Sequence, residues 1–404
     1  MLSTLRLAWR NAARNPRRTG VVIAAVAIGM AGTLVSMAIF YGMMFQMVDN
    51  AIKTDLGHVQ IHASGYDADP EIGLFLADGA GPERRALATD PAVQASSVRI
   101  RSEGLVTSPS ASVGVRVIGV DAEAERSVSM VGDAIVSGAY FAKKRTAVIG
   151  EGLARRLGVE VGNKIVISVQ DLAGDMTGES LRVGGIFRTP SAQLDRGTLF
   201  LSLTDAASLF GMNDAVTEVV IVAHSRDEVP ALQARLVAAL PGREIKRWDE
   251  IEPILASILT VMDQMAWGLY LTIFIAMSFG IANVLMMAIF ERIREFGILL
   301  AVGLSRRRLF ALVVGESLMV TGVGMLVGFG LAGLFLFALS DGIDMSGFAE
   351  GLGSFGIGTH IVPVLTRNDF TIPAVVAVAT ALVASAWPAI RAVRLRPAEA
   401  VRHD

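Results

Sequence analysis

The stretch ERIREFGILLAVGLSRRRLFALVVGE, residues 291–316, is a charged segment between two long apolar runs. Its apolar positions recur at spacings of three, four and four: Ile293, Phe296, Leu300 and Leu304. This spacing predicts one stripe of an amphipathic helix. Opposite charges three residues apart, Glu291 with Arg294 and Arg292 with Glu295, are placed to pair on the other side of that helix.

The next residues predict the end of this helix and the beginning of another. Gly303 favours the left-handed conformation that ends many helices, and Ser305 is a preferred N-cap residue. Arg306, Arg307 and Arg308 then fall in a first turn, where the helix dipole disfavours cations. Because helix stability does not account for them, we interpret them as anchors on the cytoplasmic side of a membrane. An ordinary positively charged cytoplasmic loop is the simpler alternative.

The composition indicates a protein that is partly embedded in a membrane. Of the 404 residues, 52% are hydrophobic, and the mean hydropathy is +0.53. A net charge of −2 argues against binding of nucleic acid through bulk charge. The sequence has no cysteine, which excludes disulfides, cysteine-based metal sites and thiol nucleophiles. It also has no G-x-x-x-x-G-K-[ST] phosphate loop, so we expect this chain not to bind ATP itself.

Four apolar runs are long enough to cross a bilayer. We expect transmembrane helices over residues 19–48, 263–290, 309–340 and 370–390. The first run would make a helix of about 45 Å, longer than a hydrocarbon core of about 30 Å, so we expect it to continue as a stalk. Ahead of it, residues 1–18 have arginines every four residues, which is typical of a helix lying in the membrane interface.

The placement of arginines predicts the topology. Arginines cluster in this N-terminal segment, in the loop 291–308 and in the tail 391–404. The loop 341–369 instead has one arginine, Arg367, among four acidic residues. We therefore expect both termini and the loop 291–308 to be cytoplasmic, and the large insert, residues 49–262, to lie outside the cytoplasm.

The insert between the first two spans reads as a folded domain of mixed structure. Alternating or β-rich segments predict strands over residues 57–63, 98–106, 112–120, 164–169, 181–187 and 217–223. Helical patterns cover residues 82–89, 152–157, 204–210 and 228–240. The order shows no regular βαβ rhythm, which favours an α+β fold. The expected fold class is thus a membrane protein with four transmembrane α-helices and a large α+β extracytoplasmic domain inserted between spans 1 and 2.

The central segment carries a family resemblance. The pattern R-x-R-E-x-G-x-x-x-A-x-G-x-S-R-R, followed by E-S, resembles the FtsX/MacB/LolC-LolE superfamily of ABC-transporter permeases. The positions that match and are expected to couple to an ATPase are Arg294, Glu295, Gly297, Ala301, Gly303, Ser305, Arg306 and Glu316. In the insert, the phrases SGAYF and GIFRTPSAQLD, residues 137–141 and 185–195, resemble the core domain of the same permeases, and the second phrase points to the LolC/LolE branch.

The resemblance implies a non-catalytic permease subunit in a bacterial inner membrane. A separate ABC ATPase, with its ATP and Mg, would dock on residues 291–308, and a second permease copy or paralogue would complete the membrane part. In the LolC/LolE branch the cargo is a lipoprotein, which is extracted from the membrane lipid and passed to a periplasmic carrier, with motion transmitted through the spans. Two alternatives stay open: a MacB-like exporter of peptides or amphiphiles with an adaptor, and an FtsX-like signalling subunit that controls a cell-wall hydrolase.

Three further features allow a functional and a structural interpretation. Glu316 would lie about 10 Å into the third span; a proton-coupling acid is one interpretation, and pairing with Arg306–Arg308 is the one we favour. His58 and His62, with Asp55 nearby, suit a metal-binding helix face, but the alternation of apolar residues favours histidines on the surface of a strand. The glycines at 351, 353 and 356 match G-x-G-x-x-G without the strand and helix that a dinucleotide site needs.

Overall fold

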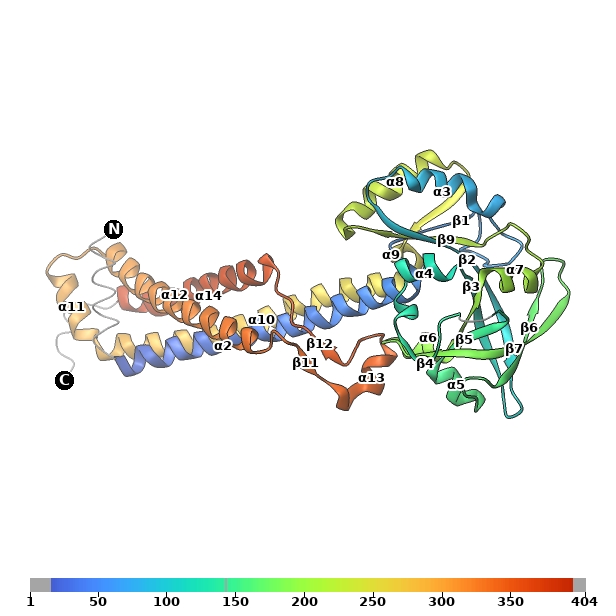
Figure 1. Ribbon diagram of the computed structural model, residues 1–404. Helices are drawn as coiled ribbons and strands as arrows, with labels where there is room; N and C mark the ends of the chain where they lie inside the picture. Colours follow the sequence, from blue (N-terminus) through green and yellow to red (C-terminus); the bar gives the residue numbers. More distant parts are fainter. Residues whose placement is uncertain (1–15, 142–143, 395–404) are drawn as a thin grey trace. The chain divides into compact units, whose positions relative to one another are not determined.

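The computed structural model describes residues 16–141 and 144–394 (Figure 1). The chain forms two compact units. A helical unit comprises the described parts of residues 1–43, 259–343 and 361–404, and a mixed unit comprises residues 44–258 and 344–360. Most of the interfacial helix expected over residues 1–18, and the last ten residues of the tail, lie outside the described residues.

Long apolar helices make up the helical unit. They are α2 (Pro16–Ala51), α10 (Pro253–Glu291), α12 (Arg306–Ala338) and α14 (Arg367–Val393), with the short α11 (Ile293–Ala301) between α10 and α12. In the described part of the chain, four helical stretches have the length and hydropathy to cross a membrane. The first two are 38 and 39 residues long, nearly twice the roughly 20 residues that a bilayer requires. Both therefore reach beyond the hydrocarbon core, and the ends of α2 and α10 belong to the mixed unit.

Small residues let the first and third long helices pack closely. A Cβ atom added to Gly324 of α12 would lie 2.7 Å from the Cβ of Val26 in α2, and one on Gly328 would lie 2.7 Å from the Cβ of Met30. Any larger side chain at either position would push the two helices apart. This is the close backbone approach that small residues provide between membrane helices.

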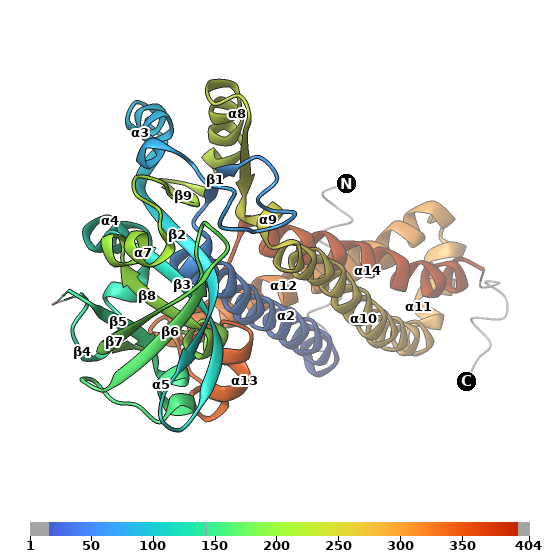
Figure 2. The ribbon, with the colours of Figure 1, turned by 90° about the vertical axis from the view of Figure 1, so that its right-hand side faces the viewer.

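A ten-stranded sheet is the centre of the mixed unit (Figure 2). Its strands are β1 (Val59–Ala63), β2 (Val93–Thr107), β3 (Ser112–Val120), β4 (Ile135–Gly138), β5 (Thr146–Gly150), β6 (Lys164–Gln170), β7 (Met176–Phe187), β8 (Thr198–Ser202), β9 (Glu218–Ala223) and β10 (Arg243–Arg247). The order is β10-β1-β9-β2-β3-β8-β5-β7-β4, and β6 pairs with β2 and β7. Most neighbours are antiparallel, but β3 with β8 and β5 with β7 are parallel.

Short helices complete this unit, which has the predicted α+β character. They are α3 (Gly81–Ala88), α4 (Ala122–Val128), α5 (Glu151–Leu157), α6 (Ala192–Gly197), α7 (Leu203–Phe210), α8 (Val229–Ala239), α9 (Trp248–Ile251) and α13 (Ala349–Ser354). Two-residue strands, β11 (Ile343–Asp344) and β12 (His360–Ile361), flank α13 in the segment between α12 and α14. Gly351 and Gly353 lie inside α13 and not in a turn between a strand and a helix.

All six predicted strands and all four predicted helices of the insert are present, and β3 has the predicted bounds. The strands β4, β5, β8 and β10 were not predicted. Two of them, β5 and β8, are five residues long and buried along nearly their whole length. A strand that is covered on both faces shows no alternation of apolar and polar residues, so the period-two signal is absent.

The prediction that His58 and His62 lie on the surface is wrong, because both side chains are buried. His58 directly precedes β1 and His62 lies in it, and β1 is an inner strand of the sheet between β10 and β9. The His58 Nδ1 atom accepts a hydrogen bond from the Ala223 amide at 3.0 Å, and the His62 ring stacks on Tyr66. Burial lowers the pKa of both imidazoles. Within the described residues, no group of three potential ligands could hold a metal ion.

Candidate coupling site

The stripe predicted for the central segment forms the inward face of α11. Phe296 is buried, and Ile293, Leu300 and Leu304 are half-buried. Phe296 belongs to an apolar cluster whose other members come from the ends of α10, α12 and α14: Ile289, Leu309, Leu312, Val313, Ala389 and Ala392. Because one helix packs against three others, its position in the helical unit is fixed by burial of apolar surface.

Arg292 adds a polar connection from the same side. It lies between α10 and α11, where its Nε atom is 2.9 Å from the Glu295 carboxylate and its Nη1 atom is 3.5 Å from the Glu316 carboxylate of α12. Its guanidinium also covers the ring of Phe296, 5.1 Å from the ring centroid. The side chains of Arg292 and Glu316 are only 14% and 10% exposed, which makes this a largely desolvated ion pair.

The expected partner of Glu316 was therefore wrong. We expected Arg306–Arg308, but the carboxylate pairs with Arg292. Arg308 is eight residues before Glu316 on the same helix, about 12 Å along its axis, and all three arginines are exposed. Arg292 reaches Glu316 because the chain turns back between α10 and α12. Glu316 and Ser317 also line a cavity of about 30 Å³, large enough for one water molecule.

The turn after α11 depends on glycine. Gly303 has a φ of +99°, in the left-handed region. The amide of the next residue, Leu304, donates to the Leu299 carbonyl at 2.9 Å, which satisfies one of the free carbonyls at the helix end. Ser305 occupies the predicted N-cap position of α12, with extended backbone angles, but its side chain makes no capping hydrogen bond. The predicted stop and start of the two helices are both confirmed.

The remaining predicted positions are divided between the two faces of the segment. Gly297 is buried within α11, and Glu295 is partly exposed and pairs with Arg292. Arg294, Ala301, Ser305 and Arg306 are exposed. The side chains of Arg294 and Arg306 are thus accessible to a partner. Glu316 is buried, and its ion pair with Arg292 attaches the segment to α12.

Sequence reasoning missed an apolar patch on the accessible side. Ile298, Leu299 and Val302 are 48%, 39% and 83% exposed, and Arg294 and Arg306, within four residues of them in the sequence, are exposed as well. The signal was present, since Ile298 and Leu299 fall off the inward stripe of α11 and Val302 directly follows that helix. Apolar side chains that share a surface with arginine are typical of the centre of a protein–protein interface.

Two family models match the chain. The model described as MacB-like periplasmic core domain matches residues 19–239, more than half of the chain, and the model described as FtsX-like permease C-terminal matches residues 267–397. The chain belongs to the FtsX/MacB family of ABC-transporter permeases. It is a membrane permease with four transmembrane helices and an extracytoplasmic α+β domain between the first two.

The permease is similar to several characterised proteins over different shares of its length. The lipoprotein-releasing system transmembrane protein LolC from Xylella fastidiosa is 23% identical over 97% of both chains. The corresponding LolE from Haemophilus influenzae is 24% identical over 93% of the permease and 91% of that protein. The macrolide export ATP-binding/permease protein MacB from Chlorobium luteolum is 23% identical over 51% of the permease and 27% of that protein.

Proposed function

We propose that the permease is the membrane subunit of an ATP-driven transporter that extracts lipoproteins from the inner membrane. The observation that carries this proposal is the match to LolC along 97% of both chains, whereas this chain spans only 27% of the macrolide exporter's own length. The 404 residues contain no phosphate loop, so the proposal assigns ATP binding, Mg and hydrolysis to a partner ABC ATPase.

The accessible face of α11 is the proposed docking surface for that ATPase. Val302, Ile298 and Leu299 supply apolar contact area, and Arg294 and Arg306 supply charge at its edge. Behind this face, Phe296 and the Arg292–Glu316 pair fasten α11 to the long helices. A partner that moves α11 would therefore move the ends of α10, α12 and α14 with it.

The arginines set the proposed orientation. Arg306, Arg307 and Arg308 are all exposed at the start of α12, and arginines also cluster near both termini. By the positive-inside rule, this end of the helices faces the cytoplasm, where an ATPase is available. The sheet domain then faces the periplasm, and a second permease copy or paralogue would supply the other half of the membrane part.

The long helices α2 and α10 are the proposed path of mechanotransmission. The chain enters the sheet domain from the end of α2 and leaves it into α10, so both covalent links between the domain and spans 1 and 2 are helical. Nucleotide-driven movement of α11 would travel along these two helices. In the periplasm the domain would pass the lipoprotein to a soluble carrier.

Purification of the permease from its native membranes in mild detergent, with mass spectrometry of the proteins that accompany it, tests this proposal. An ABC ATPase together with acylated lipoproteins is the expected result. An ATPase with an adaptor and an outer-membrane channel would instead favour an exporter like the MacB relative. An ATPase with a cell-wall hydrolase and no lipoprotein would favour a signalling subunit.

A further inference from the structure

The end of α2 has a rare geometry. Directly after Ala51 the chain forms a π-helical turn, η1 (Ile52–Leu56), in which the Gly57 amide donates to the carbonyl of Ile52, five residues back, at 2.9 Å. Such single turns are uncommon and occur often at functional sites. Gly57 then has a φ of +63°, and a Cβ atom there would lie 2.4 Å from a Val220 side-chain carbon. From this glycine the chain passes straight into β1 of the sheet.

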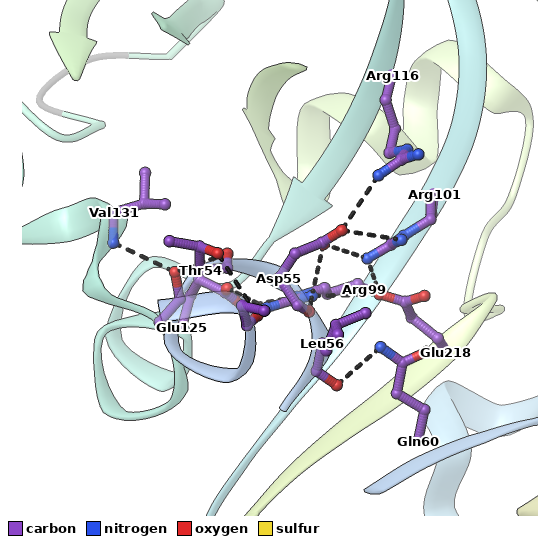
Figure 3. A network of polar contacts seen from close by, with 12 residues as sticks. Thr54, Asp55, Leu56, Gln60, Arg99, Arg101, Arg116, Glu125, Val131 and Glu218 are labelled. Atoms are coloured by element: carbon purple, nitrogen blue, oxygen red, sulfur yellow. Dashed lines mark hydrogen bonds and ion pairs between the residues drawn. The ribbon is translucent and has the colours of Figure 1, made fainter. Parts of the chain in front are cut away.

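Asp55 of this turn is held by three arginines of the sheet (Figure 3). Arg99 and Arg101 of β2 and Arg116 of β3 all bind it. The Arg99 Nη1 atom donates to the Asp55 backbone carbonyl at 2.6 Å, and the Arg116 Nη1 atom donates to the carboxylate at 3.1 Å. Both the backbone and the side chain of the turn are therefore held by the sheet.

A second layer of acids fixes the arginines. Arg99 is fully buried and makes a two-pronged contact with Glu125 of α4, at 3.1 and 2.6 Å. Glu218 of β9 lies 3.0 Å from Arg101 and 3.4 Å from Arg99. Burial alone would lower the pKa of Arg99, but the three nearby carboxylates outweigh it and raise that pKa above its ordinary value. These three arginines and three acids thus form one network in the domain, and Glu103 adds a longer contact of 3.7 Å to Arg116 at its exposed edge.

Stability alone does not explain this network. Replacing buried ion pairs by well-packed apolar residues is often neutral or stabilising, so the presence of this network is weak evidence for a role in stability. Two-pronged arginine contacts are also directional, because the guanidinium donors have a fixed planar geometry. The network therefore fixes the direction in which the end of α2 meets the sheet, at the π-helical turn η1.

We propose that η1 and its arginine network form the joint through which movement of α2 is passed to the sheet domain, with Asp55 as the positioning residue. The inference rests on the proposed mechanotransmission. Arg116 lies at the outer edge of the network, where its side chain is 38% exposed. Arg116 and Asp55 also line a cavity of about 540 Å³ in the same domain. Removing Arg116 therefore weakens the joint without opening the buried centre around Arg99.

The test uses the complete complex with its ATPase, reconstituted in liposomes with a triacylated lipoprotein. In Asp55→Asn and Arg116→Gln we expect lipoprotein released per ATP hydrolysed to fall by about threefold or more, within the range reported for residues that couple two sites. ATP hydrolysis should continue, and Arg116→Lys should restore part of the coupling. Asp90→Asn and Arg235→Gln are the matched controls, since they remove another two-pronged Asp–Arg pair in the same domain.

A distance measurement separates this inference from the proposed function. The chain has no cysteine, so spin labels can be placed on Lys53→Cys in η1 and Leu105→Cys in β2, both exposed. We expect one narrow distance distribution in the otherwise wild-type complex and a broader one with Asp55→Asn or Arg116→Gln. Equal widths, or broadening with unchanged release per ATP, would overturn the joint. If the wild-type complex releases no lipoprotein, the proposed function fails, and the spin-label widths alone decide whether the network fixes the turn.

Should Asp55→Asn fail to fold, Arg116→Gln carries both measurements, because its side chain lies at the edge of the network. The thermal midpoint of each variant is measured beside the controls. A loss of coupling that merely tracks the thermal midpoint in both variants and controls would assign the network to stability and overturn the positioning role.

Discussion

The guanidinium of Arg292 lies 3.5 Å from the carboxylate of Glu316, and this ion pair connects the start of α11 to the first third of α12. Phe296 packs beside it, under the same guanidinium. The polar and apolar contacts together make α11 an extension of the long helices. This attachment is what the proposed coupling mechanism requires of a segment that receives force from a partner.

Arg292→Met should destabilise the permease, because it removes a guanidinium from the largely buried Glu316 carboxylate. Breaking one side of a buried ion pair costs up to about 3–5 kcal/mol. The double variant Arg292→Met/Glu316→Gln should recover part of that loss, since it no longer buries a charge. The thermal midpoint of the purified permease in detergent measures both. Additive losses in the double variant would show that the two side chains do not interact.

Gly303→Ala should uncouple ATP hydrolysis from transport while the permease still inserts into the membrane. A φ of +99° costs an L-residue about 1–3 kcal/mol, although there is open space for the methyl group. The turn would relax and shift the end of α11. Gly333→Ala in α12 is the control, because that glycine also faces open space but has helical geometry. The ratio of lipoprotein released to ATP hydrolysed should fall for the first variant and not for the second.

Val302→Glu should weaken binding of the ATPase and leave the stability of the permease unchanged. Val302 is 83% exposed, so no packing is lost when it is replaced. A carboxylate at the centre of an apolar contact must be desolvated without a partner, which would weaken binding by about 2 kcal/mol or more. Val237→Glu on α8, also exposed, is the control. Normal recovery of the ATPase with Val302→Glu would place the docking surface elsewhere.

Asp195 should make the domain less stable as the pH rises from about 4 to about 6. Burial raises the pKa of this carboxyl to about 6, against the opposing effect of hydrogen bonds from Thr189. The folded state then binds more protons than the unfolded state between those two pH values, so stability is highest at low pH and is lost as Asp195 ionises. As the pH rises across this range, the thermal midpoint of wild type should fall relative to that of Asp195→Asn. A pH-independent difference would contradict the raised pKa.

The sequence predicted local features well and long-range polar contacts poorly. The stripe from Ile293 to Leu304 and the stop at Gly303 were predictable because residues within two helical turns determine them. The arginine network was not, because Arg99 contacts Asp55 and Glu218, which are 44 and 119 residues away along the chain. The burial of His58 was missed for the same reason, since only the pairing of β1 with β9 and β10 encloses it.

ATP-dependent release of a triacylated lipoprotein from liposomes that hold the permease with its co-purified ATPase tests the central claim most directly. The account predicts that lipoprotein appears in the soluble fraction with a carrier present when ATP is added, and not with a non-hydrolysable analogue. ATP hydrolysis at a normal rate with all lipoprotein still in the membrane would contradict the claim that this permease extracts lipoproteins.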